Sequence, residues 1–410
     1  MMRSDSTTTT PAFAWLHRVA TVYVLACCVM LAYSAHTSER ANWDMLGYAA
    51  VIEELTTSDP TTLHAQVYAD AREYLTPALY ADVAFGDEYR TTLAQDPILF
   101  SRQIPYYRIR VAYLTVLWTM REAGIHIHSA ASLISAISAA LACWLLFLAF
   151  RKEVDPLLWL VIPVVLKLTA AQEISRLFTA DALSFLCFAA LYYLYRRGNG
   201  AFFILLTLSV LVRTDLLIVV LLCAIYIAFF RPQWRWHALI SFVLAYLITM
   251  LISNWTNHPG WASLFYFNFM ADMEAPDPSV FAGVSISPTQ YFEVLFFKIP
   301  FFLMNEELWF YLFIIGVLSN RWLMPLWQMP TSQANTEQTS DKYTLNQRIS
   351  ALKDSLVDHP ASVGALVGIL YVGGHFLLFP LNDTRFFVGP FFIATLAALA
   401  SPTIRASRLS

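Results

Sequence analysis

Apolar runs of about 20 residues recur along the chain, and short polar segments separate them. A helix of that length crosses the hydrocarbon core of a bilayer, which is roughly 30 Å thick. The pattern therefore predicts an all-α, polytopic transmembrane protein with about 10–11 spans. We expect the spans at residues 14–35, 128–150, 157–172, 179–195, 201–213, 215–230, 237–253, 305–319, 362–380 and 385–400. The stretches 106–121 and 291–304 carry charged residues, and each could instead lie along the membrane interface.

The composition excludes a soluble domain. Of the 410 residues, 58% are hydrophobic and only 13% are charged, whereas soluble domains contain roughly 25% charged residues. The formal net charge is −3, so a basic face for binding nucleic acid is not expected. The five cysteines lie inside apolar runs, where we expect small buried side chains rather than disulfides or zinc ligands.

Lysine and arginine in the short connections predict the orientation, because cytoplasmic loops of membrane proteins are enriched in them. Arg151, Arg196 and Arg231, among others, follow predicted spans. Placing them inside puts both termini in the cytoplasm and makes residues 1–410 one integral membrane domain. A bacterial inner membrane is the expected location, with the endoplasmic reticulum as the alternative.

This orientation leaves two long segments outside, 36–105 and 254–304, and one polar segment inside, 329–360. The first directly follows the first span, is rich in acidic residues, and is expected to carry interfacial helices. Pores and carriers rarely need such a segment, whereas a membrane enzyme with its site at the outer interface does.

Charged groups near apolar spans are costly, so each is a functional candidate. Four acids fall on the predicted outer face: Asp44, Asp181, Asp215 and Asp383. Asp44 could act as a general base, hold a metal, or cap the following helix. Asp181 falls in the first turn of a predicted helix, where the helix dipole favours an anion and Thr179 could be the cap.

Arginines share this face with the acids. A guanidinium binds two oxygens of a phosphate at once, so these residues are candidate anion ligands. Arg213 could instead pair with Asp215 in a tight turn, and Arg385 could extend to the interface. Residues 102–110 could form an ordinary interfacial helix. The candidates are Arg102, Arg108, Arg176, Arg213 and Arg385.

The order of these features resembles the GT-C superfamily of polytopic glycosyltransferases, which use polyprenyl-phosphate-linked sugars. In that superfamily a long outer loop that opens with an acid follows the first helix, as 36–105 does here. The stretch Ser175–Leu183 is similar to a Thr-Pro-Asp segment, with Ala180 in place of the proline. Val212–Asp215 resembles an arginine–acid break, and Phe379–Phe387 resembles a late hairpin.

The resemblance implies an inverting glycosyl transfer from a polyprenyl-phosphate sugar to a glycan, lipid or protein acceptor. Asp44 is then the catalytic base, and Asp181 supports the site or a metal. The resemblance leaves a divalent cation open as a cofactor, and membrane lipids are expected partners. The predicted substrate-binding residues are Arg102, Arg108, Arg176, Arg213, Asp215, Asp383 and Arg385.

Three other functions fit parts of the pattern. A transporter or flippase of a lipid-linked saccharide also needs charged pairs, but it predicts charges near the bilayer midplane and two pseudo-symmetric halves. A polysaccharide polymerase or ligase typically has its large loop late in the chain. A structural membrane protein would have no chemistry, and the cluster of acids and arginines argues against that.

Overall fold

The computed structural model describes residues 11–38, 40–271, 277, 283–304, 309, 311–312, 314, 360–380 and 383–400. These residues form helices and no β-strand, which confirms the predicted all-α class. Most of the predicted span 305–319 and of the polar segment 329–360 lies outside the described residues.

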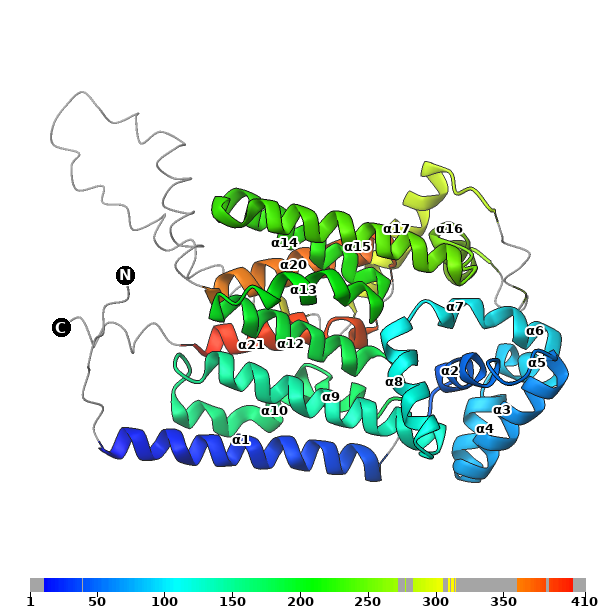
Figure 1. Cartoon of the computed structure of the whole chain (residues 1–410), viewed down its shortest axis with the longest axis horizontal. Coiled ribbons are helices and arrows are strands. Elements are labelled where there is room, and N and C mark those ends of the chain that lie inside the picture. The colour runs from blue at the N-terminus through cyan, green and yellow to red at the C-terminus, as the bar shows by residue number, and fades with distance from the viewer. Residues whose placement is uncertain are drawn as a thin grey trace.

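The longer helices run side by side along the long axis of the molecule (Figure 1). Helix α9 packs against α1 and α12, while α14 packs against α15 and α20 against α21. The bounds are α1 (Pro11–Thr37), α9 (Ile127–Phe150), α12 (Asp181–Arg197), α13 (Ala201–Leu208), α14 (Leu217–Phe230), α15 (Arg235–Trp255), α20 (Pro360–Leu378) and α21 (Val388–Leu399). Shorter pieces are η1 (Pro156–Val161), α10 (Ile162–Leu168), α11 (Ala171–Ile174), η2 (Ser209–Leu211), η3 (Thr214–Leu216), η4 (Pro232–Trp234), α16 (Trp261–Phe269), α17 (Pro288–Leu303) and η6 (Thr384–Phe386).

Among the described residues, three helical segments are long and apolar enough to cross a membrane: Ala14–Thr37, Ile127–Phe150 and Pro232–Trp255. The outward faces of α1 and α15 carry exposed apolar side chains such as Val22 and Leu251, each 68% exposed. Such surfaces are unfavourable in water and suit a lipid environment. Five shorter apolar helices lie in the same bundle.

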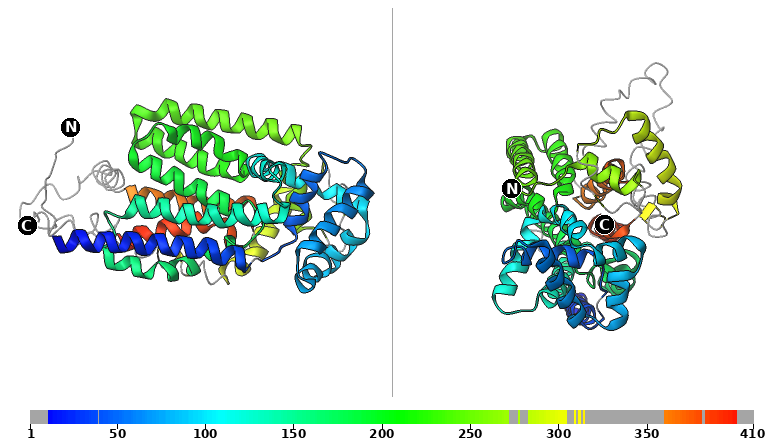
Figure 2. Two further views of the ribbon diagram at one scale, coloured as in Figure 1. Left: turned by 60° about the horizontal axis from the view of Figure 1, so that its bottom comes forward. Right: turned by 90° about the vertical axis from the view of Figure 1, so that its right-hand side faces the viewer.

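Short helices cluster at the end of the bundle where α1 finishes (Figures 1 and 2). They follow from local sequence, because Asp59, Thr76, Asp87 and Asp96 accept backbone hydrogen bonds as N-caps. Three of the acids of 36–105 therefore cap helices. Helix α8 has 12 residues, a length of about 18 Å, so by itself it is too short to cross a bilayer. The bounds are α2 (Asp44–Glu53), α3 (Pro60–Tyr74), α4 (Pro77–Phe85), α5 (Glu88–Gln95), α6 (Pro97–Gln103), α7 (Pro105–Arg108) and α8 (Val111–Glu122).

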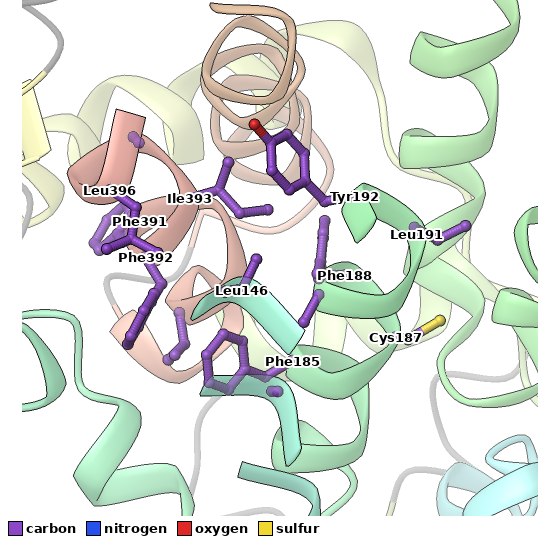
Figure 3. Packing of buried hydrophobic residues seen from close by; sticks show 14 of the residues in the cluster. Leu146, Phe185, Cys187, Phe188, Leu191, Tyr192, Phe391, Phe392, Ile393 and Leu396 are labelled. Carbon is purple, nitrogen blue, oxygen red and sulfur yellow. The ribbon is translucent and has the colours of Figure 1, made fainter. Parts of the chain in front are cut away.

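Close packing between α12 and α21 positions the segment that precedes α21. Phe185 and Phe392 face each other across this contact with ring centroids 5.4 Å apart (Figure 3). A Cβ atom at Gly389 would lie 2.7 Å from the Phe188 ring, so only glycine allows this approach. The contact holds residues 383–387 beside the first turn of α12, where Asp181 lies.

Candidate active site

A cavity of about 540 Å³ lies at the end of the bundle that carries the short helices. This volume is within the usual range for ligand pockets, roughly 300–1,000 Å³. Three acids, Asp44, Asp181 and Asp215, and three arginines, Arg110, Arg213 and Arg385, line it. Aromatic side chains form much of the remaining wall: Trp43, Tyr48, Tyr89, Tyr106, Trp261 and Phe267.

The carboxylate of Asp44 is held by three donors. Tyr107 donates its hydroxyl to Oδ1 at 3.1 Å, and Asn42 and Arg385 donate to Oδ2 at 3.1 and 3.0 Å. A carboxylate has about four acceptor positions, so this arrangement leaves roughly one for a ligand. Asp44 is the first residue of α2, but its side chain does not cap that helix.

Burial and nearby cations act in opposite directions on the pKa of Asp44. Burial raises this pKa, while the guanidinium groups of Arg385 and Arg110 lower it, and the net pKa lies below the ordinary aspartate value. Burial raises the pKa of the Tyr107 phenol far above its usual value, and the charge of Asp44 adds to that effect. At neutral pH Asp44 is therefore ionised and Tyr107 is a hydrogen-bond donor.

Arg385 connects three carboxylates. Besides its hydrogen bond to Asp44, its Nε lies 2.7 Å from Oδ2 of Asp383 and 3.9 Å from Oδ2 of Asp181. Asp383 also accepts the backbone N–H of Arg385 at 3.1 Å, which orders the turn before α21. Burial raises the pKa of Asp383 above its ordinary value, and Arg385 opposes this effect.

Arg213 lies between two acids, Asp181 and Asp215, and forms hydrogen bonds to both. Its Nε and Nη2 donate to the two oxygens of Asp215, each at 3.0 Å, and Nη1 donates to Asp181. Its guanidinium carbon lies 4.4 Å from the centroid of the Phe386 ring. Asp215 also accepts from the Tyr371 hydroxyl at 3.1 Å. The pairing of Arg213 with Asp215, expected from their spacing, is present in the structure.

The acids and arginines therefore alternate along one continuous network. It runs from Asp44 through Arg385, Asp181 and Arg213 to Asp215. These residues come from segments that are far apart in sequence: Asp44 begins α2, Asp181 begins α12, Asp215 lies in η3 directly after Arg213, and Arg385 lies in η6. Asp44 is the most exposed carboxylate of the three in the cavity wall, with 28% of its side chain exposed against 6% for Asp181 and 24% for Asp215.

Three of the predicted arginines are not part of this network. Arg102 pairs with Asp277, and Arg108 pairs with Glu54 at the edge of a second groove of about 400 Å³. Arg176 forms no ion pair within the described residues and does not line the cavity, and its backbone oxygen accepts from Arg40. Since none of the three reaches the cavity, the structure supplies no support for their predicted phosphate contacts.

Sequence reasoning missed several cavity residues. Arg110 belongs to the arginine-rich stretch noted above, but its environment could not be distinguished from that of Arg108. Tyr107, His258 and His375 also line the cavity. His375 is deep in the apolar helix α20, and a histidine in such a helix is a detectable signal because polar residues there are costly.

The arginines Arg213 and Arg385 neutralise the negative charge of the carboxylates in the site. Among the described residues there is no group of three or more histidine, cysteine, aspartate or glutamate side chains that could hold a metal ion. Arg385 and Arg213 lie between the carboxylates, so they neutralise charge that would otherwise repel. The expected support of a metal by Asp181 has no geometric counterpart in this part of the chain.

Comparison with known proteins does not assign the chain to a family. No family model matches it, and neither a curated protein nor a solved structure matches it significantly. The chemistry of the site is therefore the basis for inferring function.

Proposed function

We propose that the protein is a multi-pass membrane glycosyltransferase of the GT-C type. It transfers a sugar from a polyprenyl-phosphate donor to an acceptor on the extracytoplasmic side of a bacterial inner membrane, with both termini in the cytoplasm. The observation that carries the proposal is Asp44, an ionised carboxylate held by three donors, with an acceptor position left for a ligand at the wall of an aromatic cavity.

The proposed reaction requires a base on the acceptor side. The acceptor oxygen forms a bond to the anomeric carbon, and the bond from that carbon to the phosphate oxygen breaks with its electron pair going to the phosphate. The acceptor proton passes to Asp44. A carboxylate of low pKa is a weak base towards a free hydroxyl, but it accepts the proton readily once the new C–O bond has made that hydroxyl acidic.

The location of the charged groups favours this reaction over transport. Asp44 begins α2, one of the short helices at one end of the bundle (Figures 1 and 2), and the ion-pair network extends from it. A carrier of a lipid-linked saccharide is expected to place its charges near the bilayer midplane. Trp261 and Phe267 in the cavity wall offer flat apolar surfaces against which a sugar ring or prenyl unit can stack.

The first test follows release of the lipid product. Purified protein in detergent is incubated with polyprenyl-phosphate sugars and cell-envelope extract, and polyprenyl phosphate is measured over time. We expect release that depends on both the protein and the extract. Binding of the lipid-linked sugar with no release under any condition would contradict the transferase and favour the transporter.

Gly47 gives a test of how closely the base must be positioned. A Cβ atom at this position would lie 2.5 Å from the Tyr107 ring, so Gly47→Ala must displace the ring whose hydroxyl binds Asp44. Because small displacements of a reacting group are costly, we expect transfer to fall about 10- to 100-fold. Initial rates of polyprenyl phosphate release measure the effect.

The matched control is Gly200→Ala, because a Cβ atom at Gly200 meets no other atom within 4 Å. This control is expected to keep the wild-type rate. Equal rates for wild type and Gly47→Ala would contradict the role of Tyr107 in holding Asp44.

A further inference from the structure

Arg110 differs from the other two arginines of the cavity. Arg213 and Arg385 are each paired with at least two carboxylates. Within the described residues, by contrast, no carboxylate lies within the 4.0 Å ion-pair distance of Arg110. Its Nη1 donates to the backbone oxygen of Tyr106 at 3.0 Å, and its other N–H groups remain available to a ligand in the cavity that it lines.

The position of Arg110 is set by aromatic rings. Its guanidinium carbon lies 5.5 Å from the ring centroid of Tyr48 and 5.8 Å from that of Tyr107. Cation–π contacts of this kind hold a guanidinium without neutralising its charge. Arg110 is therefore an oriented cation that interacts with the charge of Asp44 but that no carboxylate of the described residues contacts, and such a group can bind an anionic ligand.

His258 adds a second donor to the same wall. Its Nδ1 accepts the backbone N–H of Gly260 at 3.1 Å, which assigns the ring proton to Nε2. The Nε2 atom is buried and has no hydrogen-bond partner among the residues that the structure describes. Burial lowers the pKa of His258 to about 4, and the charge of Arg110 acts in the same direction, so the ring is neutral at pH 7. The His258 ring packs edge-on against Tyr106, the residue that accepts from Arg110.

We propose that Arg110 and His258 form the receptor for the phosphate group of the donor, an inference that rests on the proposed function. The guanidinium supplies charge and two parallel N–H donors, and the imidazole Nε2–H supplies a neutral donor. Arg213 and Arg385 instead neutralise the carboxylates of the network. An unpaired buried donor such as Nε2–H is costly, and a phosphate oxygen would satisfy it.

The receptor lies next to the base. Tyr107 contacts both, because its hydroxyl donates to Asp44 and its ring lies beside the Arg110 guanidinium. A phosphate on Arg110 and an acceptor hydroxyl on Asp44 would then both lie beside Tyr107 in the same cavity. In the proposed complex the donor sugar lies between them, and the acceptor at Asp44 attacks its anomeric carbon.

Binding measured without turnover tests the receptor. The probes are a polyprenyl phosphate, the corresponding polyprenol and inorganic phosphate, each titrated into wild-type protein in detergent micelles by calorimetry. We expect the polyprenyl phosphate to bind more tightly than the polyprenol. Arg110→Gln should weaken polyprenyl phosphate binding about 10- to 100-fold, which is the size of a lost charge-assisted hydrogen bond, and leave polyprenol binding unchanged.

Variants separate the receptor from a general loss of structure. Arg110→Lys keeps the charge but lacks the planar fork, so it should recover part of the lost affinity. His258→Gln retains an N–H donor and should bind better than His258→Phe. Arg90→Gln removes an arginine that pairs with Asp87 in the short helices, and it should bind like the wild type. The thermal unfolding temperature of each variant identifies any that fail to fold.

Each outcome has a distinct meaning. Equal affinity of folded Arg110→Gln and wild type for polyprenyl phosphate would overturn the receptor. Arg110-dependent binding of inorganic phosphate with no binding of the lipid would support an anion site and contradict the lipid donor. Arg110-dependent binding of the lipid without release of product in envelope extract would keep the receptor and contradict the transferase.

Discussion

Asp44→Asn is expected to lower glycosyl transfer by about 10²- to 10⁴-fold, the usual contribution of a positioned general base. The amide has nearly the same shape as the carboxylate and still offers an oxygen to Tyr107 or Arg385, but it cannot accept the acceptor proton. Donor binding should be kept because, in the proposed reaction, Asp44 contacts the acceptor and not the donor. The measurements are initial rates of polyprenyl phosphate release and the dissociation constant of the donor.

Asp82→Asn is the matched control for this substitution. Asp82 belongs to the short helices, its side chain is 65% exposed, and its nearest cation is 3.9 Å away at Arg90. The control should therefore transfer sugar at the wild-type rate. Wild-type transfer by Asp44→Asn would remove Asp44 from the centre of the mechanism.

Arg213→Met is expected to reduce the free energy of unfolding by about 3–5 kcal/mol, the effect of breaking a buried ion pair from one side. Arg213 is only 8% exposed, and its removal leaves the buried Asp181 and the half-buried Asp215 without this cation. Unfolding of the protein in detergent by a denaturing surfactant, followed by circular dichroism, measures the change in the free energy of unfolding.

A second substitution distinguishes charge from packing. In the double variant Arg213→Met/Asp181→Asn one of the two uncompensated charges is gone, so the double variant should be more stable than Arg213→Met alone. If Arg213→Met unfolds like the wild type, the network is not a source of stability. If the double variant is less stable than the single one, Asp181 has a stabilising role beyond its pairing with Arg213.

The all-α class and the charged candidate residues could be predicted from the sequence, because both follow from the local pattern of apolar and charged residues. Long apolar runs predict helices directly, and α9 and α15 lie close to the expected spans at 128–150 and 237–253. Other boundaries differ. The expected span 157–172 is divided into η1 and α10, with Ala170 in a left-handed conformation before α11. Pro163 in the first turn of α10 lacks a backbone N–H and cannot continue a helix from η1, so the break between η1 and α10 has a local cause that the hydrophobic pattern alone does not show.

The ion-pair partners of the arginines could not be predicted from the sequence, because pairing depends on which segments meet in space. In the sequence, Arg108 and Arg110 are two residues apart in the same aromatic surroundings. In the structure one pairs with Glu54 beside the second groove, while the other lines the cavity. Likewise, the turn at Arg213–Asp215 predicts a local ion pair, but it does not reveal that Asp181 joins that pair from another helix.

The sequence by itself determined that the chain is helical and apolar, and that acids and arginines lie where helices end. These properties follow from hydrophobic periodicity and from the energetic cost of charge in apolar surroundings. Only the tertiary structure decided that Arg213 and Arg385 are occupied by carboxylates and that Arg110 is available. The physical reason is that a guanidinium's capacity to bind a ligand depends on the charges within a few ångströms of it, and packing between distant segments places those charges.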